Sequence, residues 1–229
     1  MQTFTASREA DTADELWICE HPPVFTQGLA GLTNHVLNPG TIPVVATNRG
    51  GQVTYHGPGQ LVAYPIRSLP GKHGDASPAD ITAYVCSVEQ LVIDSLGELG
   101  VAAGRQTGYP GVWIEPGTPR ARKICAIGVR VARGATARRT MHGFALNVAP
   151  DLRDMREHIV PCGIGEWPVT SLREEGSTAT LREVADVVAT TLAQPSTGTV
   201  EIELCGAVIR LSGQVDAAQL TTVLAALRA

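Results

Sequence analysis

The sequence has no long uninterrupted apolar run. No part of its 229 residues approaches the roughly 18 apolar residues that a membrane-spanning helix needs. Residues 1–15 are polar and partly acidic, unlike a secretory signal peptide. We therefore expect a cytoplasmic protein that does not bind a membrane. Hydrophobic residues make up 44% of the chain, which excludes a disordered protein and suits one large domain or two small ones.

Residue patterns typical of metal, redox and hydrolase sites are also missing. The five cysteines are far apart and none belongs to a CxxC motif, which excludes a zinc ribbon and a thioredoxin-type site. The six histidines form neither HxH nor HExxH, so we expect no metal. No GxSxG motif marks a serine hydrolase, and no GxxxxGK(S/T) loop marks a nucleotide site. Separated cysteines are typical of free thiols in a reducing compartment.

Lysine and aromatic residues are scarce. Only Lys72 and Lys123 are lysines among the 18 basic residues, and aromatics make up 4% of the chain. Because the interleaved aromatics of a base-stacking surface are absent, we expect no nucleic acid partner. Residues 105–156 carry 10 basic and 3 acidic side chains, net +7, although the whole chain has a net charge of −4. This segment indicates either an acidic partner or a solvated arginine face.

The order of helical and extended patterns predicts an α+β (mixed α/β) fold, a mixed sheet flanked by helices in a single domain. Apolar alternation predicts strands at 16–19, 44–47, 60–66, 111–115, 124–132 and 141–148. Ser77 as N-cap with Pro78 predicts a helix to about Leu99, and a Thr180–Glu183 capping box predicts a helix to about Ala193. Residues 151–157 are predicted as a short helix or turn.

The chain is expected to divide near residue 193. Residues 194–198 read as a linker, so residues 1–193 are predicted as the catalytic domain and 194–229 as an appended tail. Within the tail we expect a hairpin from 200–204 and 208–211 around Gly206, followed by a helix from Asp216 to Arg228. No role for this tail follows from its sequence.

The segment Arg49–Gln60, with the sequence RGGQVTYHGPGQ, concentrates chemistry in one place. Its four glycines allow a backbone to approach a ligand closely. A tight hairpin with structural glycines is the alternative, but it does not explain why arginine, threonine, tyrosine, histidine and glutamine share the turn. We therefore predict a binding loop over residues 49–59.

Two further residues are candidates for catalysis. Lys123 stands at the start of an apolar strand in a chain that otherwise uses arginine, and lysine can lose a proton when it is desolvated. Cys162 lies between Pro161 and Gly163 in a loop, which suits an exposed nucleophile. The alternatives are a surface lysine and a core thiol. The other four cysteines lie in apolar patterns and are predicted as core thiols, with Cys125 near the pocket.

Together these segments resemble the octanoyl-acyl carrier protein:protein N-octanoyltransferases, also called lipoyl(octanoyl) transferases. The resemblance spans about residues 10–193 and rests on an upstream segment and four ordered motifs: 20–28, 49–60, 123–129, 142–147 and 161–163. It implies the fold shared by lipoate and biotin protein ligases. It also implies that a strand and most of a helix that usually come first in the family are missing before Met1. Residues 135–140 look like an insertion, predicted as a longer hairpin loop.

The resemblance implies roles for individual residues. Cys162 would be the nucleophile that carries the acyl group as a thioester, and Lys123 would lower its pKa and relay protons. His142 would have a supporting role. We also expect backbone N–H groups near Gly143 or Cys162 to stabilise the oxyanion. The acyl pocket would be lined by Arg49, Gly50, Gly51, Gln52, Val53, Thr54, Tyr55, His56, Ala126, Ile127, Gly128, Gly143, Phe144 and Ala145.

The implied reaction transfers an octanoyl group from octanoyl-acyl carrier protein to a lysine of a lipoyl domain, without a cofactor. The acceptors implied are the lipoyl domains of 2-oxoacid dehydrogenase subunits or the glycine cleavage H protein. Two alternatives stay open. One is an ATP-dependent lipoate or biotin protein ligase, which would need no cysteine at position 162. The other is an inactive module that binds acyl carrier protein or lipoyl domains.

Overall fold

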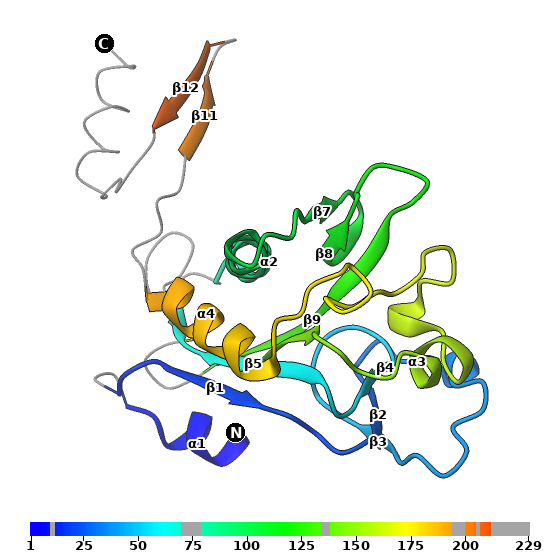
Figure 1. Ribbon diagram of the computed structural model, residues 1–229. Coiled ribbons are helices and arrows are strands. Elements are labelled where there is room, and N and C mark those ends of the chain that lie inside the picture. The colour runs from blue at the N-terminus through cyan, green and yellow to red at the C-terminus, as the bar shows by residue number, and fades with distance from the viewer. Residues whose placement is uncertain (10–11, 70–78, 134–137, 194–199, 205–206, 212–229) are drawn as a thin grey trace. The chain divides into compact units, whose positions relative to one another are not determined.

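The largest sheet is antiparallel throughout. In the computed structural model, which describes residues 1–9, 12–69, 79–133, 138–193, 200–204 and 207–211, seven strands form this sheet. Its hydrogen-bonded order is β1-β5-β10-β9-β8-β7, with β6 paired to β10. Figure 1 labels β1, β5, β7, β8 and β9 of this sheet. The strands are β1 (Glu15–Cys19), β5 (Gln60–Ile66), β6 (Ser68–Leu69), β7 (Gly104–Gln106), β8 (Tyr109–Ile114), β9 (Arg122–Arg133) and β10 (Arg138–Asn147).

The long hairpin of β9 and β10 forms the centre of this sheet. Its register pairs Leu146 with Cys125 and Gly143 with Gly128, and it continues to the pair Arg138 and Arg133. Residues 138–140, expected to be part of an inserted loop, are therefore strand, because each has a hydrogen-bonding neighbour in β9. Residues 135–137 of the predicted insertion lie outside the described part of the chain.

A second, three-stranded sheet combines parallel and antiparallel pairing. It contains β2 (Val24–Gln27), β3 (Val44–Ala46) and β4 (Thr54–His56), with β2 parallel to β3 and antiparallel to β4. The mixed pairing expected from the sequence occurs here rather than in the large sheet. The prediction of an uninterrupted loop over residues 49–59 is wrong, because Thr54–His56 pair with Val24–Thr26. The chain leaves β4 and enters β5, which joins the two sheets.

The helices begin and end at identifiable signals. Helix α2 (Ile81–Glu98) is capped by Asp80, whose carboxylate accepts from Ala83 N, and not by Ser77, which lies outside the described residues. Gly100, with φ +76°, follows its last turn as expected. Helix α4 (Leu181–Ala193) has the predicted capping box, since Thr180 N donates to Glu183 Oε2 and Glu183 N donates to Thr180 Oγ1. The shorter elements are α1 (Gln2–Ser7), α3 (Arg153–Glu157) and the 3₁₀ turns η1 (Thr33–His35) and η2 (Pro161–Gly163).

A buried cluster fixes the small sheet beneath the cysteine loop. Phe25 and Tyr55, with ring centroids 5.6 Å apart, pack with Val53 and with Met155 of α3. Leu152, Ile159 and Val169 complete the cluster. The segment that leads from α3 to Cys162 is therefore held against β2 and β4 by apolar packing.

The chain separates into two compact units, Met1–Ala189 and Thr190–Ala229. In the second unit, β11 (Val200–Leu204) pairs antiparallel with β12 (Ala207–Leu211). Gly206 and the expected helix from Asp216 lie outside the described residues. The boundary at residue 193 stays a prediction, as does any role of the tail.

Candidate active site

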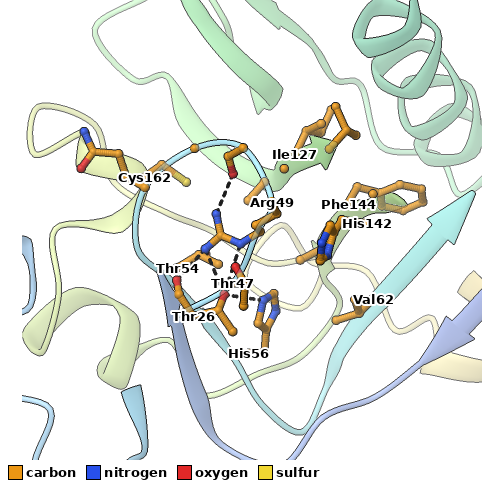
Figure 2. Close-up of a pocket in the computed structure, with 18 of the residues that line it drawn as sticks. Thr26, Thr47, Arg49, Thr54, His56, Val62, Ile127, His142, Phe144 and Cys162 are labelled. Atoms are coloured by element: carbon orange, nitrogen blue, oxygen red, sulfur yellow. Dashed lines mark hydrogen bonds between the residues drawn. The ribbon is translucent and has the colours of Figure 1, made fainter. Parts of the chain in front are cut away.

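A cavity of about 570 Å³ lies between the large sheet and the loop that precedes β4 (Figure 2). One wall comes from β5, β9 and β10 and includes Val62, Tyr64 and Phe144. The other comes from β2, β4 and residues 47–52. Apolar residues Ile81 and Val85 of α2 also line it. The volume is within the range of small-molecule sites.

Most sequence-predicted site residues line this one cavity. They are Arg49, Gly50, Gly51, Gln52, Thr54, His56, Lys123, Ala126, Ile127, Gly128, His142, Gly143, Phe144, Ala145 and Cys162. Segments more than 100 residues apart in the chain are thus brought together by the pairing of β5, β10 and β9.

Val53 and Tyr55 do not line the cavity, which corrects the expectation that the whole run 49–56 would. Their side chains are 0% and 2% exposed and pack in the cluster around Phe25. Successive side chains of a strand point to opposite faces, so Thr54 and His56 face the cavity while Tyr55 faces the core. The inward and outward alternation of residues 53–56 is not evident from the sequence, because the glycines on both sides of β4 favour a loop.

Cys162 lies in η2 with a left-handed backbone, φ +57° and ψ +14°. Its backbone N–H donates to Val53 O at 2.8 Å, and Gly163 N donates to Val160 O at 3.0 Å. Both amides are already used within the protein, which does not favour the Cys162 N–H as an oxyanion donor, and the expected alternative near Gly143 stays a prediction. The side chain is half-buried and lines the cavity.

The other described cysteines differ from one another. Cys125 is fully buried and Cys19 is half-buried, and burial raises the pKa of both thiols. Cys86 is exposed on α2, so its prediction as a core thiol is wrong. Position 86 falls on the outer face of the helix, whereas Tyr84, Val88 and Val92 lie on its buried face. Cys205 lies outside the described residues.

Lys123 is buried in a site formed by Pro110, Gly111 and Trp113 of the adjacent strand β8. It is 6% exposed, its Nζ donates to Pro110 O at 2.8 Å, and it lies 5.3 Å from the centroid of the Trp113 ring. Gly111, at φ +126°, leaves room for it: a Cβ there would be 2.5 Å from Lys123 Cε. Lys123 and Cys162 line the large cavity together, and they also share a second cavity of about 10 Å³.

Glu89 fixes the strand that surrounds Lys123, and the sequence analysis did not identify this residue. Its Oε1 accepts from Gly111 N at 2.9 Å, and its Oε2 accepts from Arg105 Nε at 2.9 Å. The signal was an acidic residue beside Val88 on the buried face of the predicted helix. A buried carboxylate needs partners, and its partners here are two residues of the β7–β8 region.

Arg49 is a buried cation in the wall of the cavity. Its Nη2 donates to Thr26 O at 2.5 Å, its Nε donates to Thr26 Oγ1 at 3.3 Å, and its Nη1 donates to Gly50 O at 2.9 Å. Burial lowers its pKa, and no carboxylate of the described residues forms an ion pair with it. Figure 2 shows Arg49 between Cys162 and the pair His142 and Phe144. Its charge therefore favours negative charge that develops near Cys162.

A chain of hydrogen bonds continues from Arg49. Thr26 Oγ1 lies 3.2 Å from His56 Nε2, and His56 Nδ1 lies 2.7 Å from Gln60 Oε1. Gln60 Nε2 donates to Asn147 Oδ1 at 2.9 Å. Because Gln60 offers its oxygen to His56, Nδ1 carries the imidazole proton and Nε2 accepts from the threonine hydroxyl.

Of the three described histidines that line the cavity, His56 and His142 are neutral at pH 7. Burial lowers the pKa of His56 to about 4, and it lowers the pKa of His142 to about 4, with help from the nearby Arg49 charge. His142 has a left-handed backbone at φ +60°, and its Nε2 lies 2.6 Å from Asn48 Oδ1. These histidines can hold polar groups in place, but they add no positive charge to the cavity.

This depression of two pKa values predicts a loss of stability on mild acidification. The unfolded chain takes up protons near the ordinary histidine pKa of 6.5, whereas folded His56 and His142 resist protonation until about pH 4. The free energy of unfolding is therefore highest above pH 6.5, as far as these histidines determine it, and it falls as the pH decreases from 6.5 toward 4. We expect the melting temperature to drop by several degrees between pH 7 and pH 5, as measured by calorimetry.

The double variant His56→Gln, His142→Gln is the control for this effect. Carboxylates with lowered pKa values, such as Glu175 and Asp151, lose their contribution only below about pH 4.5. The variant should therefore show a flatter dependence between pH 7 and pH 5. An unchanged slope would contradict the assignment of this dependence to the two histidines.

The arginines of residues 105–156 are largely paired. Five of them form ion pairs within the same unit: Arg105–Glu89, Arg120–Glu115, Arg122–Glu175, Arg153–Asp151 and Arg156–Glu174. Arg139 is 4% exposed and donates to Thr5 O. Because Glu115 and Asp151 are already counted in the net charge of +7, only the three partners outside the segment, Glu89, Glu174 and Glu175, reduce it, and they leave +4.

The described residues contain no group of three or more histidine, cysteine or acidic side chains that could hold a metal ion. Among the described helices, none is both long and apolar enough to cross a membrane.

Comparison with known proteins gives a consistent result. A family model described as the lipoyl protein ligase A/B catalytic domain matches residues 1–193. An octanoyltransferase of Albidiferax ferrireducens is 45% identical over 209 residues, which cover 82% of this chain and 86% of that protein. An octanoyltransferase of Xanthomonas campestris pv. campestris is 45% identical over 194 residues, covering 85% and 77%. One from Shewanella sp. (strain ANA-3) is 42% identical, covering 85% and 82%.

Solved structures share the fold. A bipartite lipoate protein ligase from Thermoplasma acidophilum superposes with a TM-score of 0.66 at 18% identity, over 84% of this chain and 74% of that chain. A lipoate-protein ligase A bound with ATP gives a TM-score of 0.61 at 18% identity, over 84% and 76%. The predicted ligase-like α/β fold is thus confirmed.

Proposed function

Since the chain belongs to the lipoyl protein ligase A/B catalytic domain family and to its octanoyltransferases, we propose that it transfers octanoyl from octanoyl-acyl carrier protein to a lipoyl-domain lysine through a thioester on Cys162. The observation that carries the proposal is the joint position of Cys162 and Lys123 on one mostly apolar cavity. A nucleophile at the wall of a cavity of this size can receive a medium-length acyl chain.

The first half-reaction exchanges one thioester for another. Cys162 gives its thiol proton to the Lys123 amine, and Sγ attacks the carbonyl carbon of the octanoyl thioester on the pantetheine arm of the carrier. The bond from that carbon to the carrier sulfur then breaks, and the carrier leaves as a thiol after taking up a proton. The buried Lys123 ammonium, 2.8 Å from Pro110 O, is the proposed proton donor, because lysine, unlike arginine, can give up a proton.

The second half-reaction forms an amide. The unprotonated amine of the acceptor lysine attacks the acyl carbon on Cys162, the C–S bond breaks, and the amine proton passes by way of Lys123 to the cysteine sulfur or to solvent. A thioester is converted into a more stable amide, so the transfer needs no ATP. No cofactor enters either step.

The proposed acceptors are lipoyl domains of 2-oxoacid dehydrogenase subunits or the glycine cleavage H protein, and the proposed compartment is the cytoplasm. Half-buried Cys162, needed as a thiol, supports a reducing environment.

The test is acylation without nucleotide. The purified protein is incubated with octanoyl-acyl carrier protein in the absence of ATP, and intact-protein mass spectrometry should detect one octanoyl adduct on Cys162. Adding apo lipoyl domain should then remove the adduct and yield an octanoylated domain. Labelling of the domain only with free octanoate and ATP would indicate a ligase instead. Carrier or domain binding without any adduct would indicate an inactive binding module.

A further inference from the structure

The side chain of Gln52 is aligned beside the cysteine loop. Its Oε1 lies 2.7 Å from His35 Nδ1. The same carboxamide borders Gly163, where an added Cβ would lie 2.8 Å from Gln52 Cδ and 2.8 Å from Gln52 Nε2. Gln52 and Cys162 line the same cavity. The carboxamide of Gln52 is thus positioned by His35 and lies beside Gly163, the residue that follows Cys162.

The segment that contains His35 is joined to the cysteine loop by main-chain hydrogen bonds. Val160 N donates to His35 O at 2.8 Å, and Val36 forms an isolated β-bridge with Ile159. Residues 35–36 and 159–160 are therefore joined by main-chain hydrogen bonds. Because Cys162 N also donates to Val53 O at 2.8 Å, His35, Gln52 and Cys162 share one rigid set of backbone contacts.

The backbone of the cysteine loop has no amide to spare for a reacting carbonyl. Cys162 N donates to Val53 O, Gly163 N donates to Val160 O, and Ile164 N donates to Pro161 O at 2.9 Å. A tetrahedral intermediate on Cys162 still needs hydrogen-bond donors for its oxygen. A side-chain donor next to the loop can supply what these amides do not, in addition to the charge of Arg49.

Gln52 Nε2 has the required capacity. A carboxamide has two N–H donors on nitrogen, and its oxygen accepts separately. The oxygen is engaged with the Nδ1–H of His35, and within the described part of the chain no acceptor is recorded for Gln52 Nε2. Its two N–H groups are therefore available to a ligand in the cavity.

We infer that Gln52 is a catalytic residue that donates from Nε2 to the thioester oxygen as Cys162 attacks, and that His35 is its positioning residue. This inference rests on the proposed function. In the step, the Sγ–C bond forms, the carbonyl π pair moves to oxygen, and the Nε2–H hydrogen bond strengthens as negative charge grows there. The charge returns to the carbonyl when the bond to the carrier sulfur breaks. Gln52 neither gains nor loses a proton.

The experiment measures single-turnover acylation of the full chain by octanoyl-acyl carrier protein in a quench-flow series. For Gln52→Ala we expect the maximal acylation rate to fall by about 10²–10³-fold, the loss typical of a missing oxyanion donor. The carrier concentration at half-maximal rate should hold within about twofold, and the final adduct should match wild type. Gln52→Glu, which keeps the shape but lacks the donor, should be at least as slow.

His35 is tested by rescue and by a double-mutant cycle. His35→Ala should slow acylation, while His35→Asn, whose Nδ2–H can replace the Nδ1–H, should restore most of the rate. If His35 acts through Gln52, His35→Ala should add little to Gln52→Ala in the double variant. Fully multiplicative effects would overturn the positioning role.

The inference and the proposed function fail in different ways. If wild type forms no adduct, the proposed function fails. If wild type forms the adduct and Gln52→Ala reacts at the same maximal rate, Gln52 is not the donor and the proposed function stands. A Gln52→Ala variant that needs more carrier but keeps the maximal rate would assign Gln52 to substrate binding alone, which also overturns the inference.

Discussion

The Cys162→Ser variant should form no octanoyl adduct and should lose transferase activity by more than about 10³-fold. A cysteine reacts as a thiolate, and it is intrinsically far more nucleophilic than a serine hydroxyl that lacks a general base. His56 and His142 have pKa values of about 4 and are engaged with Gln60 and Asn48, and His21, which also lines the cavity, is hydrogen-bonded to Tyr64. None of these three imidazoles is thus arranged to activate a serine at position 162. The measurement is intact-protein mass spectrometry together with octanoylation of apo lipoyl domain.

Cys86→Ser is the matched control, since it makes the same atom change at an exposed thiol on α2, a residue that is not among those lining the cavity. Its adduct and turnover should equal those of wild type. Cys162→Ser should also melt near the wild-type temperature, because sulfur and oxygen differ little in size at this half-buried position. If Cys162→Ser formed as much octanoyl adduct as wild type, the proposed thioester intermediate on Cys162 would be refuted.

The Lys123→Arg variant should lose turnover by about 10²–10³-fold even though it keeps a positive charge. Arginine cannot release a proton at any pH that the protein tolerates. The surroundings of Lys123 also suit an ammonium: Pro110 O accepts one hydrogen bond from Nζ at 2.8 Å, and the Cε atom packs so closely on Gly111 that a Cβ there would lie 2.5 Å away. The readouts are steady-state turnover with octanoyl-acyl carrier protein and the fraction of acylated protein at equilibrium.

Two comparisons make this prediction specific. Arg182→Lys, a conservative exchange at an exposed residue of α4 that pairs with Asp186 at 3.0 Å, should leave turnover unchanged. Lys123→Met should be as slow as Lys123→Arg if proton transfer is what the lysine supplies. Near-normal turnover in Lys123→Arg would reduce Lys123 to an electrostatic role.

The parts of the fold that the sequence predicted well depend on local signals. Residues 60–66 form β5 with the predicted bounds, and the capping box of Thr180 opens α4 as expected. The binding loop and both catalytic candidates also lie together on one cavity. Local alternation, capping and motif spacing were sufficient for these.

The missed residues depend on contacts distant in sequence. Glu89 reaches Gly111 across 22 positions and His35 reaches Gln52 across 17. Neither pair has a local pattern, because each forms only when separate elements pack. Tyr55 was misplaced for another reason: glycines at both ends of β4 concealed a three-residue strand.

The left-handed backbone at Cys162 has a thermodynamic consequence. A side chain held at φ +57° opposes the conformational preference of an L-residue by roughly 1–2 kcal/mol. Glycine would adopt the same backbone without that penalty. Selection for folding stability alone would therefore favour glycine at position 162, next to Gly163 with φ +71°. Under the proposed function, the thiol at this position adds reactivity at the expense of the stability of the fold, and a glycine in its place would give a more stable but inert loop.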